Sequence, residues 1–205
     1  MGRHWILATT ALILAGCASL PQQPTRPRVA LETTAGRIVL ALDPAAAPIS
    51  TCNFIGYVVF GDYDNGAFFR TVLRETNTAN PHPIDVIQAA TPRGSDDDSR
   101  PPIRLERTRD TGLRHVAGTV SMARDGPDSA TSSFFIVIRD TPSLDFGGAR
   151  NPDGQGFAAF GQVIEGMDVA RRIQGMPANA EEQLTPPVTI RSARLLDAVP
   201  SVCTR

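Results

Sequence analysis

Two segments near the middle of this chain decide the fold that we predict for it: Gly118-Thr119-Val120-Ser121-Met122-Ala123 and Ser132-Ser133-Phe134-Phe135-Ile136. Each has the short apolar pattern of a β-strand, and we expect strands over 118–123 and 133–138. The second strand is apolar on both of its faces, which predicts that other parts of the protein cover both. The segments on either side should therefore supply the neighbouring strands.

The flanking segments add further strands and two helices. Ile38, Leu40 and Leu42 alternate along one face of a strand, which a turn joins to the preceding segment in a hairpin. One helix starts at Pro48, where a missing N–H is no loss, and a second covers 167–174. The remaining strands are expected over 67–72, 84–88, 157–164 and 188–195. About eight short strands without βαβ alternation predict a mainly β fold, a closed eight-stranded antiparallel barrel capped by two helices.

The composition narrows the classes of function. Of the 205 residues, 41% are hydrophobic and 20% charged, and the formal net charge is −1, which fits one globular domain and offers no basic surface to nucleic acid. Beyond the first residues the only histidines are His82 and His115, and neither has the spacing of a metal-ligand set. The run Asp96-Asp97-Asp98 lacks the spacing of a calcium loop and is expected to be solvated. With no nucleophile motif, phosphate loop or dinucleotide fingerprint, the sequence predicts no metal, no cofactor and no hydrolase chemistry.

The N-terminal residues have the pattern of an export signal. Arg3 precedes an uncharged apolar run over 5–14, which is short for a bilayer span but typical of a secretory signal. The run ends in Leu14-Ala15-Gly16-Cys17, which resembles the bacterial lipoprotein cleavage box, where the cysteine carries the lipid. The alternative is an ordinary signal peptide cut nearby, with Cys17 incidental.

This interpretation divides the chain into three parts and predicts a location. The parts are a signal over 1–17, a proline-rich tether over 18–28 and a folded domain over 29–205. The expected location is the cell envelope, with the domain facing the periplasm and a lipid on Cys17 in a membrane. Ala18 stands where an aspartate would indicate inner-membrane retention, so the outer membrane is expected.

Two cysteines remain besides Cys17, at Cys52 and Cys203. In an oxidising compartment such a pair can form a disulfide, which would close a long loop and stabilise by about 4–5 kcal/mol on the loop-entropy argument. The alternative is two separate thiols, Cys52 buried on a helix and Cys203 in a loose tail. The sequence leaves both open, because it does not show whether the two sites are close.

Several segments occur in an order that resembles one known family. They are Ala47-Pro48-Ile49-Ser50-Thr51-Cys52-Asn53-Phe54, Phe68-Phe69-Arg70, Val86-Ile87-Gln88, the two central strands, and Phe160-Gly161-Gln162-Val163-Ile164-Glu165-Gly166-Met167. Each match is weak alone, but the ordered set resembles the cyclophilin-type peptidyl-prolyl cis-trans isomerases from about Val29 to Leu196.

The resemblance implies an enzyme that rotates X-Pro peptide bonds and so assists protein folding outside the cytoplasm. Amide resonance opposes this rotation by ~18–20 kcal/mol, so the enzyme has to bind the twisted bond better than either planar isomer. A fixed guanidinium can do this by a hydrogen bond to the prolyl nitrogen as that atom becomes pyramidal. Arg70 is the candidate for this role.

The resemblance also implies an apolar pocket for the proline ring. Phe135 would form its floor, Val86 and Leu144 its walls, and Gln88 would hold Arg70 or a substrate carbonyl. The catalytic residues are thus expected to be Arg70, Gln88 and Phe135, and the substrate-binding residues Val86, Ala123, the backbone of Arg124, Leu144 and Phe157. The expected partners are proline-containing unfolded or extended polypeptides and a membrane, and the protein is expected to be a monomer.

The chain departs from the family pattern around this pocket. Asp85 stands where a phenylalanine is usual, and a buried carboxylate there is costly unless it points away or pairs. If it paired with Arg70, it would dampen catalysis. The other departures are Phe69 for a histidine, Val86 for a methionine, Ser133 for a glutamine, Ser143 for an aromatic residue, Phe157 for a histidine or tyrosine, and 71–83 in place of a short turn. They keep open a second hypothesis, a non-catalytic chaperone or scaffold that binds proline-containing segments.

Overall fold

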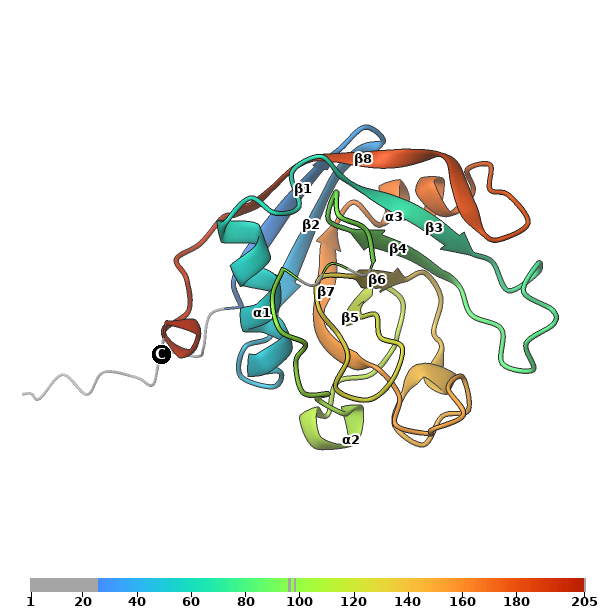
Figure 1. Ribbon diagram of the computed structural model, residues 1–205, viewed down its shortest axis with the longest axis horizontal. Helices are drawn as coiled ribbons and strands as arrows, with labels where there is room; N and C mark the ends of the chain where they lie inside the picture. Colours follow the sequence, from blue (N-terminus) through green and yellow to red (C-terminus); the bar gives the residue numbers. More distant parts are fainter. Residues whose placement is uncertain (1–25, 96, 98, 205) are drawn as a thin grey trace, which may run out of the picture.

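Eight strands close into an antiparallel barrel in the computed structural model, which describes residues 26–95, 97 and 99–204 (Figure 1). The strands are β1 (Arg28–Thr33), β2 (Gly36–Leu42), β3 (Gly66–Val72), β4 (Val86–Ala90), β5 (Thr119–Met122), β6 (Phe134–Val137), β7 (Ala158–Glu165) and β8 (Gln183–Leu195). Their order around the barrel is β1-β2-β7-β5-β6-β4-β3-β8, with antiparallel neighbours throughout. The predicted fold class is confirmed.

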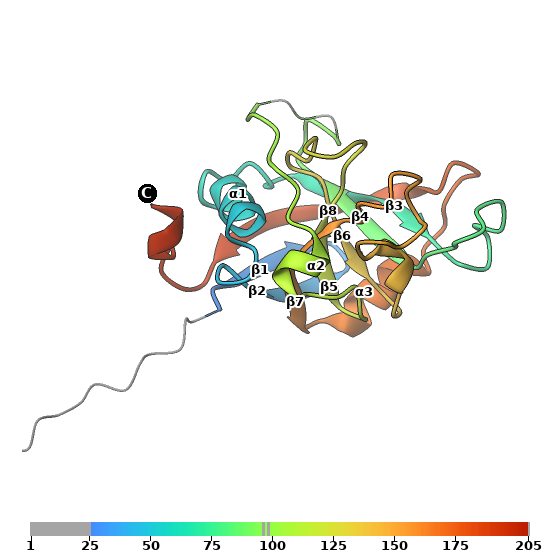
Figure 2. The ribbon, with the colours of Figure 1, turned by 90° about the horizontal axis from the view of Figure 1, so that it is seen from below.

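Two helices, α1 (Pro48–Val59) and α3 (Met167–Gln174), lie on opposite sides of the barrel (Figures 1 and 2). At the start of α1 the carboxylate of Glu106 accepts hydrogen bonds from the N–H groups of Ile49 and Ser50, at 2.9 and 2.8 Å, which favours a helix start there. The structure adds three short helices that were not predicted: α2 (Thr108–Thr111), η1 (Pro142–Leu144) and η2 (Ser201–Cys203). Within the described part of the chain, none of the helices has the length and apolar character needed to cross a bilayer.

An aromatic cluster fills the barrel and fastens α1 to it. The ring of Phe54, on α1, lies 5.2 Å from the rings of Tyr63 and Phe134 and 5.3 Å from that of Phe160, and all four side chains are buried. Aromatic pairs at such distances add to the free energy gained by burial alone. The packing of Phe54 against these rings therefore fixes α1 on the barrel.

Two strands start at least two residues away from the predicted position. β4 starts at Val86 rather than at residue 84, and β8 starts at Gln183 rather than at residue 188. The added part of β8 includes Pro186 and Pro187, which are exposed. They are tolerated because they lie in a stretch of β8 that has no partner in β3: Val188 is opposite Phe68, and the next pair is Gln183 with Arg70.

The C-terminal tail returns to α1. Cys203, in η2, forms a disulfide with Cys52 of α1, and their Cα atoms are 5.0 Å apart. The structure therefore pairs the two cysteines rather than leaving two separate thiols. Cys17, the signal over 1–17 and the tether up to residue 25 lie outside the described residues.

Candidate functional site

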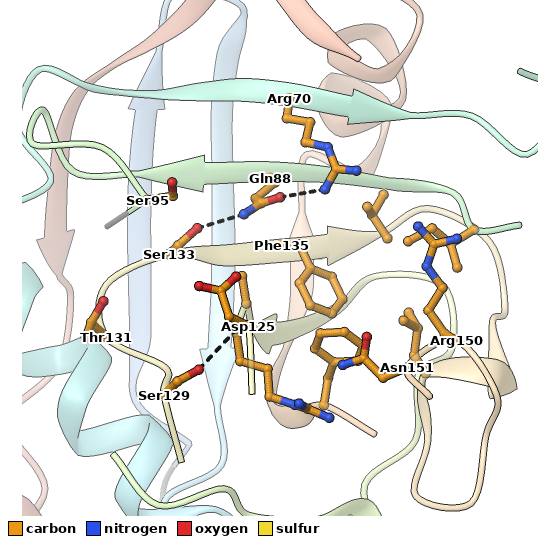
Figure 3. A pocket seen from close by; sticks show the side chains of 16 residues that line it. Arg70, Gln88, Ser95, Asp125, Ser129, Thr131, Ser133, Phe135, Arg150 and Asn151 are labelled. Atoms are coloured by element: carbon orange, nitrogen blue, oxygen red, sulfur yellow. Dashed lines mark hydrogen bonds between the residues drawn. The ribbon is translucent and has the colours of Figure 1, made fainter. Parts of the chain in front are cut away.

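A cavity of about 280 Å³ lies on the outer face of the barrel, over β3, β4 and β6 (Figure 3). Its lining includes all eight pocket residues predicted from the sequence: Arg70, Val86, Gln88, Ala123, Arg124, Phe135, Leu144 and Phe157. It also includes eight residues that were not predicted to line it: Ile84, Ser95, Asp125, Ser129, Thr131, Ser133, Arg150 and Asn151. The predicted set thus shares one cavity although it is spread over some 90 residues of sequence.

A bulge in β3 aims Arg70 at this cavity. The register against β4 shifts between Phe68 and Arg70, so that Phe68 faces Ala89 and Arg70 faces Gln88. Phe68 is buried in the barrel core, whereas Val72 belongs to the apolar cluster under the cavity. In strict alternation, residues 68, 70 and 72 would share one face. The extra residue changes the phase of the strand and so places Arg70 outside.

Two side chains hold the guanidinium of Arg70. Its Nη1 donates to Oε1 of Gln88 at 3.2 Å, while Nε and Nη2 donate to Oε2 of Glu182 at 3.1 and 2.5 Å. Glu182 is in turn fixed by Nδ2 of Asn77, at 2.6 Å from its Oε1. Glu182 was missed by sequence reasoning, since it lies 112 residues from Arg70 and in no motif that links the two.

Gln88 is itself oriented by the strand beside it. Its Nε2 donates to Oγ of Ser133 at 3.0 Å, and that hydroxyl donates to the Ala89 carbonyl at 3.2 Å (Figure 3). The amide oxygen of Gln88 therefore faces Arg70. Ser133, a departure from the family pattern, supports the arrangement rather than breaking it.

The floor of the cavity is apolar. Phe135 belongs to a buried cluster with Val72, Ile84, Val86, Val137 and Leu144. The ring of Phe157 meets that of Phe135 edge to face, with centroids 5.4 Å apart and an interplanar angle of 88°. This surface can receive a small aliphatic ring and exclude water around it.

A buried polar cluster stands behind this floor. The His115 ring stacks on Phe135 with centroids 6.1 Å apart, and its nitrogens lie 2.8 Å from Oδ1 of Asp145 and 2.9 Å from Oγ of Ser121. Burial raises the pKa of Asp145, but the hydrogen bonds from the ring and the N–H of His115, together with the nearby positive charge of Arg114, outweigh it and leave that pKa below its ordinary value. This cluster was not predicted from the sequence, where His115 was considered only as a metal ligand. They hold the floor and the adjoining Leu144 in place.

Asp85 does not reach the cavity. The residue is buried, and its carboxylate accepts hydrogen bonds from Nε of Arg139 at 2.8 Å, from the Arg74 N–H at 3.0 Å and from Nε2 of Gln174 at 3.1 Å. The structure thus gives Asp85 partners other than Arg70.

The side chain of Arg124 is occupied within the protein. It pairs with Asp153 at 2.7 Å and donates from Nη2 to the Gly156 carbonyl at 2.6 Å, with 1% of the side chain exposed. The neighbouring Ala123 donates its N–H to the Ser133 carbonyl at 2.9 Å. The Arg124 side chain therefore shapes the cavity, and the role of its backbone in substrate binding stays a prediction.

Comparisons with known proteins agree with this geometry. A family model described as cyclophilin type peptidyl-prolyl cis-trans isomerase/CLD matches residues 28–195. Peptidyl-prolyl cis-trans isomerase A of Dickeya dadantii is 37% identical over 198 residues, which cover 93% of this chain and 97% of that protein. Peptidyl-prolyl cis-trans isomerase cyp18 of Streptomyces antibioticus is 38% identical over 173 residues, covering 82% and 98%.

Solved structures share the fold. The crystal structure of a Cryptosporidium parvum cyclophilin type peptidyl-prolyl cis-trans isomerase superposes with a TM-score of 0.68 at 19% identity, covering 84% of this chain and 99% of that one. A second structure of that protein, in the presence of the dipeptide Ala-Pro, has the same TM-score and identity and covers 83% and 99%.

Proposed function

This chain belongs to the cyclophilin-type peptidyl-prolyl cis-trans isomerases, and we propose that it isomerises X-Pro bonds through Arg70, Gln88 and Phe135 while tethered in the cell envelope. Its substrates are proline-containing unfolded or extended polypeptides, and it works as a monomer without a cofactor. The family relationship supports the assignment of the reaction. The roles of the residues and the location are our proposal.

One observation carries the catalytic proposal: the guanidinium of Arg70 is held in a fixed orientation in the same cavity as the apolar floor. Three of its five N–H groups donate to Glu182 and Gln88, so one on Nη1 and one on Nη2 have no acceptor in the described part of the chain. A proline ring on Phe135 would bring the prolyl nitrogen within reach of these groups. They would stabilise the pyramidal nitrogen of the twisted bond more than the planar amide, whose nitrogen is a poor acceptor.

The alternative, a module that binds proline-containing segments without catalysis, rested on Asp85, Val86 and Ser133. Asp85 pairs with arginines other than Arg70, Val86 lines the cavity, and Ser133 orients Gln88. None of the three removes a group that the reaction needs, and catalysis is the better-supported proposal.

Exchange spectroscopy on an X-Pro peptide separates the two functions. With catalytic amounts of the protein, we expect cis and trans proline signals to exchange within a second, compared with tens of seconds or longer for the free peptide. Saturable shifts of the peptide signals without faster exchange would contradict the catalytic proposal and favour the binding module.

We also propose that the mature protein begins at a lipid-modified Cys17 and faces the periplasm, in the outer membrane. The support is the apolar run that ends in Leu14-Ala15-Gly16-Cys17, together with the Cys52–Cys203 disulfide, which fits an oxidising compartment. Cells fed labelled palmitate should give a labelled protein in the outer-membrane fraction, and a Cys17→Ser variant should be unlabelled. Equal labelling of both proteins, or a cytoplasmic wild type, would overturn this proposal.

A further inference from the structure

Three arginines line the cavity, and they differ in whether a carboxylate neutralises them. Arg70 pairs with Glu182 at 2.5 Å and Arg124 with Asp153 at 2.7 Å. Arg150 forms no ion pair with any residue that the structure describes. It is therefore the one arginine of the described lining that no carboxylate pairs with directly.

Hydrogen bonds hold the guanidinium of Arg150 in place but leave some of its N–H donors unused. Its Nη1 donates to Oδ1 of Asn77 at 2.9 Å and to the His82 carbonyl at 3.2 Å. These bonds leave the N–H groups of Nε and Nη2 without an acceptor in the described ranges. That edge of an arginine matches the two oxygens of a carboxylate.

The surroundings favour an anion at this place. Burial, and secondarily the positive charge of Arg70, lower the pKa of Arg150, and together they outweigh the opposite effect of the negative charge of Glu182. The guanidinium stays charged at neutral pH, but its charge is less well solvated than on an open surface. The acidic Asp125 also lines the cavity, but Figure 3 shows it on the other side of the Phe135 ring from Arg150. A substrate carboxylate would thus be drawn to the Arg150 side.

We propose that Arg150 is a specificity-determining residue that binds the side-chain carboxylate of an aspartate or glutamate next to the substrate proline. This inference rests on the isomerase function proposed above. Arg150 lines the same cavity of about 280 Å³ as Phe135 and Leu144, so a residue directly before or after a proline bound on this floor would share the cavity with the guanidinium. The substrate class is therefore acidic proline-containing segments.

The test compares C-terminally amidated peptides that differ only in Asp against Asn, placed directly before or directly after the proline. For one of the two placements the wild-type kcat/KM should be about fivefold higher for the Asp peptide, the scale of a charge-assisted pair open to solvent on one side. The preference should shrink when the ionic strength is raised to about 0.5 M. Amidation keeps a terminal carboxylate from imitating the side chain.

Variants of Arg150 decide whether this residue is responsible. Arg150→Gln should bring the Asp-to-Asn ratio to about one, and Arg150→Lys should keep part of the preference because the charge is retained. A purely structural role, through Asn77 and His82, would lower both rates together and leave the ratio unchanged. Arg171→Gln, which removes an exposed arginine outside the cavity lining, is the matched control and should keep the wild-type ratio.

Two outcomes would overturn the proposal: a wild-type ratio near one in both placements, or a preference that survives Arg150→Gln. If no peptide is isomerised at all, the isomerase function fails instead. Titration of the same peptides still tests the role of Arg150 in that case. The wild type should bind the Asp peptide more tightly than the Asn peptide, and Arg150→Gln should bind the two equally.

Discussion

Replacing Arg70 with alanine should lower kcat/KM for an X-Pro peptide by about 10²- to 10³-fold, the usual loss when one oriented donor to a transition state is removed. The structure explains why the loss should be this large. The guanidinium is held on two sides by Gln88 and Glu182, so little reorientation is needed when the peptide bond twists. A water molecule in the space of the missing side chain would have to be ordered during each reaction.

The decisive measurement is the split between kcat and KM. Because the extra hydrogen bond forms only with the twisted bond, Arg70→Ala should lower kcat and leave KM nearly unchanged. Arg70→Lys keeps the charge but lacks the planar fork that Gln88 and Glu182 hold, and it should fall between the two proteins. The exposed Arg171→Ala is the control for the loss of one positive charge. A rate for Arg70→Ala within threefold of the wild type would remove Arg70 from the mechanism.

The strands, the barrel and the predicted pocket residues could be read from the sequence because each depends on a local pattern. Alternation of apolar residues marks a strand, and the ordered family segments mark which strand faces the cavity. Gln88 was predicted as a partner of Arg70, but the other partner of Arg70 and the side-chain partner of Arg150 could not be read in this way. Glu182 and Asn77 come from loops far from those residues in sequence, and only the closed barrel brings them together.

The bulge in β3 had no clear signal either. Phe68-Phe69-Arg70 reads as an ordinary strand segment, and strict alternation would put Phe68 and Arg70 on one face. The extra residue is required because β3 both fills the core with Phe68 and presents Arg70 outside. Such a shift follows from the packing of three strands and not from the residues of one.

The partners of Asp85 could not be predicted from the sequence either. The sequence indicated that a carboxylate at this position has to point away or pair, but not with which partner. In the structure it accepts hydrogen bonds from Arg139, from the backbone of Arg74 and from Gln174. Asp85 thereby ties the loop after β3, the end of β6 and helix α3 together under the cavity.

Asp85→Ala should therefore lower the free energy of unfolding by about 3 kcal/mol at neutral pH. The loss comes from part-buried donors that lose an acceptor, chiefly the Arg74 N–H and one N–H of the Gln174 amide, which keeps only its bond to the Val72 carbonyl. Arg139 contributes less, because its side chain is 52% exposed and water can solvate it. Arg139→Ala is the matched control and should lower the stability less than Asp85→Ala does. Urea unfolding of the three proteins measures both differences, and equal stabilities for wild type and Asp85→Ala would contradict the role of Asp85.

The effect of Asp85 should also depend on pH in a defined direction. Burial alone raises the pKa of Asp85, but the hydrogen bonds from Arg139 and the Arg74 N–H and the charges of both arginines outweigh it, so the pKa lies below its ordinary value. A carboxyl whose pKa is lowered by folding stabilises above its unfolded pKa of about 4, and this contribution is lost as the pH falls through the folded pKa. The stability difference between wild type and Asp85→Asn, which cannot ionise, should be constant from pH 7 to about pH 5 and shrink below about pH 4. A difference that stayed constant or grew down to about pH 3 would show that the ionised carboxylate is not what holds these three elements together.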